Sequence, residues 1–546
     1  MPVLPLIKRT GQWLSRSFIQ EKMDNPLGYI VMIILALFVA YTVSIFGKMS
    51  IILPVLFIAI PAAAACLVYM DFGIAVSIIV AYLIGLAAKM AQSVPFGIAL
   101  DALLFLMFVG MMIRQIKERD FEFAKNKISY FIVVWVIYNI LSVFNPWAQS
   151  QMAWIFTVRS MAVLALMFFV AAYAFKDLKT IMRILKLIIL MTTISAIYGL
   201  KQEFIGFASW EMEWLSSDEK RMQLIYQWTR IRVFGFFSDP TNYGMLLSYM
   251  ATFCIVLITG PFKIWQKVLL GIAVVCMIAS MGYAGSRTPF VLFPFGLFIF
   301  VLLKMNKTIM LVTGVTTVLA MAVIIKGGHN NAVLFRISSA FMLSKSADTM
   351  DVRFESQKLI QPYIHRHPIG MGLGSTGVWG ARFSPNSFLS SFQHDSGLVR
   401  IAVELGWIAL IMYCLMLYTI LRTTIYYYFR VRNPRIKVIY LGLATIFFQL
   451  VLASYPQEAI IILPTSINFY VFLAILVRLK DFDDPPLPRK KNGFGNYAKA
   501  YISVKGVPID KPSTKPDLEK AKGGRKKHVL PFGINLELKR GGIWRK

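Results

Sequence analysis

Charged residues are scarce in this chain, and acidic residues are the scarcest of them. Only 15% of the 546 residues are charged, whereas 57% are hydrophobic, and the mean hydropathy is +0.64. So little charge cannot cover the surface of a soluble protein of this length, which excludes a string of soluble domains. Lys and Arg number 57 against 27 Asp and Glu, which gives a formal net charge of +30.

Cysteine is also rare, and its positions exclude two further classes of protein. All four cysteines fall within apolar runs, at Cys66, Cys254, Cys276 and Cys414. We interpret them as small core residues. This interpretation excludes a disulfide framework and a thiolate metal site.

Apolar runs close to the ~20 residues that cross a bilayer recur along the chain. We therefore predict an all-α, polytopic membrane protein with about fourteen transmembrane helices. The predicted spans are 28–46, 50–69, 72–91, 95–113, 128–144, 160–175, 184–203, 242–259, 268–284, 288–303, 308–325, 398–421, 438–454 and 459–477.

The positive charge could indicate a nucleic-acid-binding protein, but its distribution argues against one. Lys and Arg cluster in short segments between the apolar runs and in the tail after Leu479. Basic loops stay in the cytoplasm, so the N-terminus and the tail are both predicted to be inside. We expect membrane lipid, and no nucleic acid, as a partner.

The spans and loops divide the chain into seven predicted parts. The first outer loop is rich in Trp and acidic residues, which predicts a short helix at the membrane interface, and the second is long enough to be a folded cap. The parts are a cytoplasmic interfacial N-terminus (1–27), an N-terminal transmembrane bundle (28–203), the first outer loop (204–241), transmembrane helices with an outer Ser-Arg-Thr turn (242–325), the large outer loop (326–397), C-terminal transmembrane helices (398–479) and a basic, mostly disordered cytoplasmic tail (480–546).

Four of the five histidines lie in the large outer loop, at His329, His365, His367 and His394. Histidine exchanges protons near neutral pH, so the cluster suggests acid–base chemistry. The alternative is that a loop simply tolerates polar residues, which we favour for His329 and His365. The His-x-His spacing is not that of a helical pair of metal ligands, and no metal site is expected.

Two arginines at the predicted outer face break the positive-inside trend. Arg232 precedes the turn Gly235-Phe-Phe-Ser-Asp-Pro-Thr-Asn242, and Arg287 lies in Gly285-Ser-Arg-Thr-Pro289. A planar guanidinium at the membrane edge is suited to holding phosphate. The alternative is that each arginine reaches lipid head groups or pairs with a carboxylate.

The large outer loop ends in two further motifs. A Gly-x-Gly-x-Gly stretch at 370–374 has no preceding strand, so it does not indicate a nucleotide site. It predicts a turn in which the backbone passes close to another group. Arg400 and Glu404 then fall at i and i+4 as the chain enters the next span. Charges in a span are normally paired or functional, and we expect this pair to brace the helix.

The order and spacing of these motifs resemble those of the bacterial O-antigen ligases and the related polymerases of lipid-linked glycans. That family has an Arg before a Gly-Phe turn, a Ser-Arg-Thr turn, a His-Pro-x-x-Gly-x-Gly loop and a His-Asn…Glu-x-Gly segment. The resemblance covers about residues 180–425, although Asp395 stands where the family usually has Asn. The matching stretches here are 196–202, 232–242, 286–288, 367–374 and 394–406.

The resemblance implies a GT-C-like fold in the bacterial cell inner membrane, with the large loop in the periplasm. It implies an inverting, metal-independent glycosyltransferase without a cofactor, acting on an undecaprenyl diphosphate-linked glycan and a glycan or lipid A core acceptor. A chain-length regulator or a flippase would be its protein partner. The implied catalytic residues are His394, Arg232 and Arg287, and the implied substrate-binding residues are Arg353, His367, Arg400 and Asn242.

Three alternatives stay open at this point. The extra spans favour a polymerase slightly over a ligase. A lipid-linked oligosaccharide flippase or another transporter should carry ionisable residues in the middle of several helices, and few are found here: Asp101, Arg159, Arg400 and Glu404. A non-catalytic scaffold would not need Arg and His together at the outer face.

Overall fold

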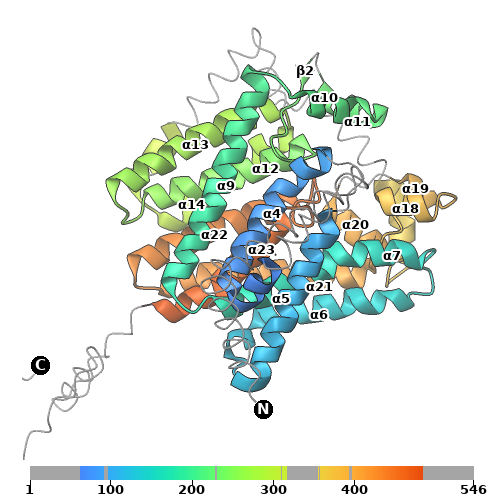
Figure 1. Cartoon of the computed structure of the whole chain (residues 1–546), viewed down its shortest axis with the longest axis horizontal. Coiled ribbons are helices and arrows are strands. Elements are labelled where there is room, and N and C mark those ends of the chain that lie inside the picture. The colour runs from blue at the N-terminus through green and yellow to red at the C-terminus, as the bar shows by residue number, and fades with distance from the viewer. Residues whose placement is uncertain are drawn as a thin grey trace, which may run out of the picture. The chain divides into compact units, whose positions relative to one another are not determined.

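The computed structural model describes residues 62–90, 96–227, 230–308, 310–315, 355, 357–392 and 396–483 (Figure 1). The predicted interfacial N-terminus, the span 28–46 and the tail beyond residue 483 lie outside the described residues. His329, Arg353 and His394 lie outside them as well. The predictions made for those parts of the chain therefore stay predictions.

Within the described residues the chain is helical apart from one small hairpin. Two-residue strands, β1 (Tyr226–Gln227) and β2 (Arg230–Ile231), pair antiparallel there. Ten helical segments in the described part of the chain are long and apolar enough to cross a membrane, so the chain is a polytopic membrane protein. They are α4 (Met70–Met90), α5 (Phe96–Glu118), α6 (Lys127–Leu141) with a 3₁₀ turn, α7 (Gln151–Val158) joined to α8 (Leu166–Ala174), α9 (Leu178–Phe204), α12 (Pro240–Ile258), α13 (Ile264–Ala284), α14 (Arg287–Lys304), α21 (Gly406–Arg430) and α22 (Pro434–Ala453).

These ten segments overlap ten of the fourteen predicted spans. Three of the other four, 28–46, 50–69 and 308–325, lie wholly or largely outside the described residues. The last, predicted at 459–477, is the shorter helix α23 (Thr465–Arg478) of 14 residues, which a 3₁₀ turn extends to Phe482. The total of about fourteen spans stays a prediction.

Two predicted spans need correction. The one placed at 160–175 begins earlier, at Gln151, because a π-helical turn over Arg159–Val163 joins α7 to α8. The one placed at 398–421 is broken in two, since a short helix α20 (Gly397–Glu404) ends just before α21 begins. The break falls at Gly406, which has a φ of +87° and lies so close to the Pro368 carbonyl that a side chain would collide with it.

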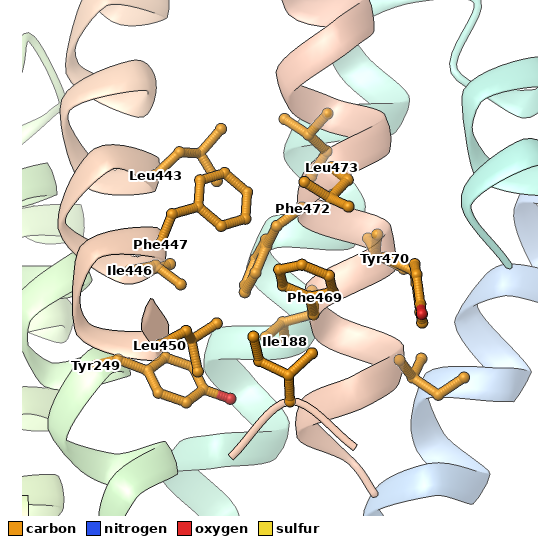
Figure 2. Packing of buried hydrophobic residues seen from close by; sticks show 14 of the residues in the cluster. Ile188, Tyr249, Leu443, Ile446, Phe447, Leu450, Phe469, Tyr470, Phe472 and Leu473 are labelled. Carbon is orange, nitrogen blue, oxygen red and sulfur yellow. The ribbon is translucent and has the colours of Figure 1, made fainter. Parts of the chain in front are cut away.

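The core lies around α12, α22 and α23, where aromatic and branched side chains interleave (Figure 2). The Phe447 and Phe469 rings meet edge to face with 5.9 Å between their centres. The ring centres of Phe253 on α12 and Phe472 are 6.2 Å apart. In an apolar 18-residue stretch of α12, 83% is buried, whereas in the corresponding stretch of α5 only 22% is buried. α12 is therefore a central helix, and α5 lies at the periphery with apolar side chains exposed.

The cysteine prediction is only partly confirmed. All four thiols are free, and Cys66 and Cys254 are buried as expected. Cys276 is half-buried, however, and Cys414 is exposed on α21. The interpretation of Cys414 as a core residue was wrong, because an apolar run in a membrane helix has a lipid-facing side as well as a packed one.

Loops predicted to share a side of the membrane contact one another. At the end that carries the basic loops, here called the basic end, Arg478 donates to the Phe175 carbonyl at 3.2 Å and Tyr428 to the Leu303 carbonyl at 3.3 Å. At the opposite end, here called the loop end, Asn145 donates to the Gly370 carbonyl at 2.9 Å. These contacts agree with the predicted alternation of the helices, while the side that each end faces rests on the positive-inside rule.

The sidedness can be tested by cysteine labelling. We expect a membrane-impermeant maleimide added to intact spheroplasts to label Glu213→Cys at the loop end and not Pro261→Cys at the basic end, because only the loop end is predicted to face outward. A Cys276→Ser/Cys414→Ser background removes the two thiols that are not fully buried. Permeabilised cells, in which both positions should react, provide the control. The reverse labelling pattern would overturn the predicted orientation.

Candidate functional site

The start of α12 is fixed by the turn that the sequence analysis singled out. The Asp239 carboxylate caps the helix by accepting the backbone N–H of Thr241 at 3.1 Å and of Asn242 at 2.9 Å. Pro240 occupies the first turn, where its missing N–H costs nothing. The Asn242 side chain also donates one N–H to Asp239 at 2.6 Å, so its amide oxygen and its second N–H are left for the predicted substrate contact.

Arg232 lies against the ends of three elements. Its Nε donates to the Ala284 carbonyl at 3.0 Å, one terminal nitrogen donates to Thr241 Oγ1 at 3.3 Å, and the other to the Leu224 carbonyl at 3.5 Å. Burial lowers the pKa of this guanidinium, and the nearby Asp239 carboxylate opposes that effect. Three of its five N–H groups are used, and the remaining two, one on each terminal nitrogen, form a fork suited to phosphate oxygens.

The turn that receives Arg232 is the Ser-Arg-Thr turn. α13 ends at Ala284, Gly285 adopts a φ of +59°, and α14 begins at Arg287. The Val233 N–H donates to the Tyr283 carbonyl at 3.2 Å, which holds the two segments together. The structure thus places Arg232 against the turn that carries Arg287, although the two residues are 55 positions apart in the sequence. We call this place the arginine site.

A buried polar cluster holds the backbone next to Arg232. Gln202 of α9 accepts the Gly235 N–H at 2.8 Å and donates to Glu211 at 2.6 Å. Glu211, on α10 (Ser209–Ser216), is fully buried and also accepts the Ala208 N–H at 2.8 Å. Lys89 of α4 donates to the Gly235 carbonyl at 3.4 Å and lies 4.0 Å from the centre of the Phe234 ring.

This cluster was missed by sequence reasoning, although parts of it carried a signal. A lone lysine at the end of an apolar run and a glutamate in a Trp-rich loop each indicate a charge near the membrane edge, but nothing in the sequence pairs them. The predicted short helix of the first outer loop is confirmed by α10 and the neighbouring α11 (Glu219–Ile225). Its location at the membrane interface stays a prediction.

The Gly-x-Gly-x-Gly stretch passes close to other backbone, as predicted. Gly370, Gly372 and Gly374 have φ values of +77°, +102° and +81°, which side chains rarely adopt. A Cβ on Gly372 would lie 2.7 Å from Cβ of Ala148, and one on Gly374 would lie 2.6 Å from the Ala153 carbonyl oxygen. This stretch is therefore packed against the α6–α7 connection and α7.

Glu404 joins this stretch to α20. Its carboxylate is fully buried, accepts the Gly374 N–H at 3.1 Å and the Thr376 hydroxyl, and lies 3.3 Å from Arg400 Nε. The predicted Arg400–Glu404 pair is thereby confirmed, and the structure adds a second carboxylate, since Arg400 donates to Glu458 at 2.6 Å. Burial lowers the pKa of Arg400, but the two carboxylates outweigh it and raise that pKa above its ordinary value. A substrate-binding role for Arg400 stays a prediction.

His367 has one ring nitrogen committed to the protein. Its Nδ1 lies 2.8 Å from the Tyr363 carbonyl oxygen, and its ring meets Trp147 edge to face at 5.0 Å. A carbonyl can only accept, so Nδ1 carries the proton of the neutral ring and Nε2 is an acceptor. That arrangement suits the predicted contact with a sugar hydroxyl.

No family model matches the chain, and no curated protein matches it. The likeness to O-antigen ligases accordingly rests on the motifs and their order. Within the described residues no three His, Cys, Asp or Glu side chains are grouped so as to hold a metal ion. The absence of a metal from the reaction stays a prediction, because part of the large outer loop lies outside those residues.

Arg400 provides a test of how the loop end is held together. We expect Arg400→Met to lower the free energy of unfolding by about 3–5 kcal/mol, because it leaves Glu404 buried and without its cation. Thermal unfolding of the purified protein in detergent, followed by tryptophan fluorescence, measures the change. Arg430→Met is the matched control, since Arg430 is exposed and contacts Tyr426 rather than a carboxylate. Equal stability of the two variants would contradict the bracing role.

Proposed function

We propose that this membrane protein is a glycosyltransferase of the O-antigen ligase or polymerase type. It transfers a glycan from undecaprenyl diphosphate to an acceptor glycan or lipid A core at the outer face of the bacterial inner membrane. One observation carries the proposal: Arg232 is held against the turn of Arg287, at the end of the bundle predicted to face outward. A polyprenyl diphosphate in the outer leaflet presents its charge at that level.

The arrangement at Arg232 supports binding of a diphosphate rather than mere contact with lipid. Its Nε donates to the Ala284 carbonyl, which fixes the plane of the guanidinium. Two N–H groups remain for an anion. The polar cluster of Gln202, Glu211 and Lys89 holds the adjacent backbone at Gly235. Such preorganisation lets a cation stabilise a leaving group without reorganising first.

The proposed reaction is a single displacement at the anomeric carbon. The acceptor hydroxyl oxygen attacks from the face opposite the diphosphate, the bond from the anomeric carbon to the phosphate oxygen breaks, and undecaprenyl diphosphate leaves with that electron pair. Arg232 and Arg287 neutralise the leaving diphosphate. His394 takes the proton of the attacking hydroxyl, and the configuration inverts. His367 and Asn242 hold sugar hydroxyls.

A transporter is the second candidate, and one observation favours it. Arg159, at the π-helical turn between α7 and α8, forms an ion pair with Asp101 of α5 at 2.8 Å. An ion pair between two spans is the kind of feature that lines a transport path. A second ion pair between described spans, Asp71–Arg183 at 3.6 Å, lies at the exposed ends of α4 and α9. Within the described spans these pairs do not form a row along several helices, so we place the transporter second.

The arginine site gives the sharpest test of the enzyme. We expect Arg232→Lys and Arg287→Lys each to reduce transfer by on the order of 10²–10³-fold, because lysine keeps the charge but loses the planar fork. Transfer is measured with purified protein, a lipid-diphosphate-linked glycan and an acceptor. Arg230→Lys is the matched control: it lies on the same hairpin, is exposed, and pairs with Glu203 at 3.2 Å.

The same assay tests the proposed base. His394→Ala should lose a comparable factor, and less at high pH, where hydroxide partly replaces the ring. Near-normal transfer by both lysine variants and by His394→Ala would contradict the proposal. So would a loss in Arg230→Lys equal to that in Arg232→Lys.

Deletion of the gene separates the subgroups and the transporter. Loss of glycan on lipid A core indicates a ligase, and a surface glycan stopped at one repeat indicates a polymerase. Accumulation of lipid-linked repeats on the cytoplasmic side of the membrane indicates a flippase and would contradict the proposed enzyme. Glycan analysis by gel electrophoresis and mass spectrometry gives the readout, with the plasmid-restored strain as the control.

A further inference from the structure

A groove of about 860 Å³ lies at the basic end, between α6, α21 and the end of α23. It is far along the spans from the arginine site, at the ends of the helices predicted to be cytoplasmic. The proposed function makes no use of it. Its fifteen lining residues are all described, and they divide into a charged part and an apolar part.

The charged part carries four cations and no acid. Lys125 and Lys127 flank the start of α6, Arg422 lies on α21, and Lys480 follows α23. All four are exposed, and none forms an ion pair within the described part of the chain. The N-terminus of α6 adds its partial positive charge. A concave surface with this charge attracts an anion and offers it several donors at once.

The apolar part begins deeper along the same helices. Phe131 and Val134 of α6 face Met412 of α21 across the groove. Val134 lies seven residues beyond Lys127, which is roughly 10 Å along a helix. Val134 is half exposed, so the groove opens outward at a depth where the protein meets acyl chains. Tyr130 and Tyr426, both exposed, lie between the two parts, as tyrosines at a membrane interface do.

We propose that this groove binds an anionic phospholipid, with its phosphate at the four cations and the upper part of an acyl chain against Phe131, Val134 and Met412. A soluble anion would use the cations and leave the apolar walls unused. A lipid without net charge would use the walls and leave the cations uncompensated. The tail after residue 484 is basic in sequence, so charge favours an anionic lipid over the tail as the occupant.

The test uses the full chain, purified in detergent and titrated with phosphatidylglycerol, with bound lipid counted by native mass spectrometry. We expect Lys125→Gln/Lys127→Gln/Arg422→Gln to bind at least threefold less phosphatidylglycerol than the parent. Val134→Trp, which keeps every cation and fills the apolar wall, should bind less as well. Thermal unfolding of each variant checks that the bundle is intact.

Matched controls make the result decisive. Lys263→Gln/Lys307→Gln/Arg435→Gln removes three exposed cations at the same end outside the groove, and its binding should equal that of the parent. An equal loss in this control would reduce the effect to general surface charge and overturn the proposal. So would equal binding of phosphatidylcholine. Displacement of the lipid by millimolar inorganic phosphate, with Val134→Trp unaffected, would make the groove a free-phosphate site instead.

Discussion

A carboxylate that water cannot reach must be fully bonded, and at the loop end Glu404 is in that position. Its oxygens accept from Gly374 and Thr376 and face the guanidinium of Arg400, which in turn holds Glu458. These groups come from three segments of the chain. Because the buried Glu404 carboxylate must be bonded, the glycine-rich stretch, α20 and the segment before α23 are held together.

The first outer loop is held by the same principle with different residues. Glu211 is fully buried and is satisfied by Gln202 and by backbone, while Gln202 and Lys89 bond the backbone at Gly235. Gln202 and Lys89 come from spans, so the loop is fixed to rigid helices as well as by its own contacts. Loops fastened in this way can present a guanidinium such as that of Arg232 at a defined place, which is what a preorganised anion site needs.

Hydropathy predicted most of the described spans, because the bilayer requires about 20 apolar residues and helical hydrogen bonding wherever the chain crosses it. Local spacing likewise predicted the Arg400–Glu404 pair and the close approach of backbone at Gly370–Gly374. The pairing of Arg400 with Glu458 could not be predicted from the sequence, since the two are 58 positions apart. Only the packing of α20 against the segment before α23 brings them together. The break at Gly406 was missed because its cause, the Pro368 carbonyl, lies in another part of the chain.

The π-helical turn at Arg159–Val163 has a geometric consequence for the span that contains it. A residue added to an α-helix turns everything beyond it by about 100° around the axis, and a π turn is such an added residue. α7 packs on α18 (Gly377–Phe383) (Figure 1), while α8 packs on α5 and α23. The two halves of this span therefore present different faces to the rest of the protein. A single inserted residue is enough to pack α7 against a helix of the large outer loop and α8 against the core.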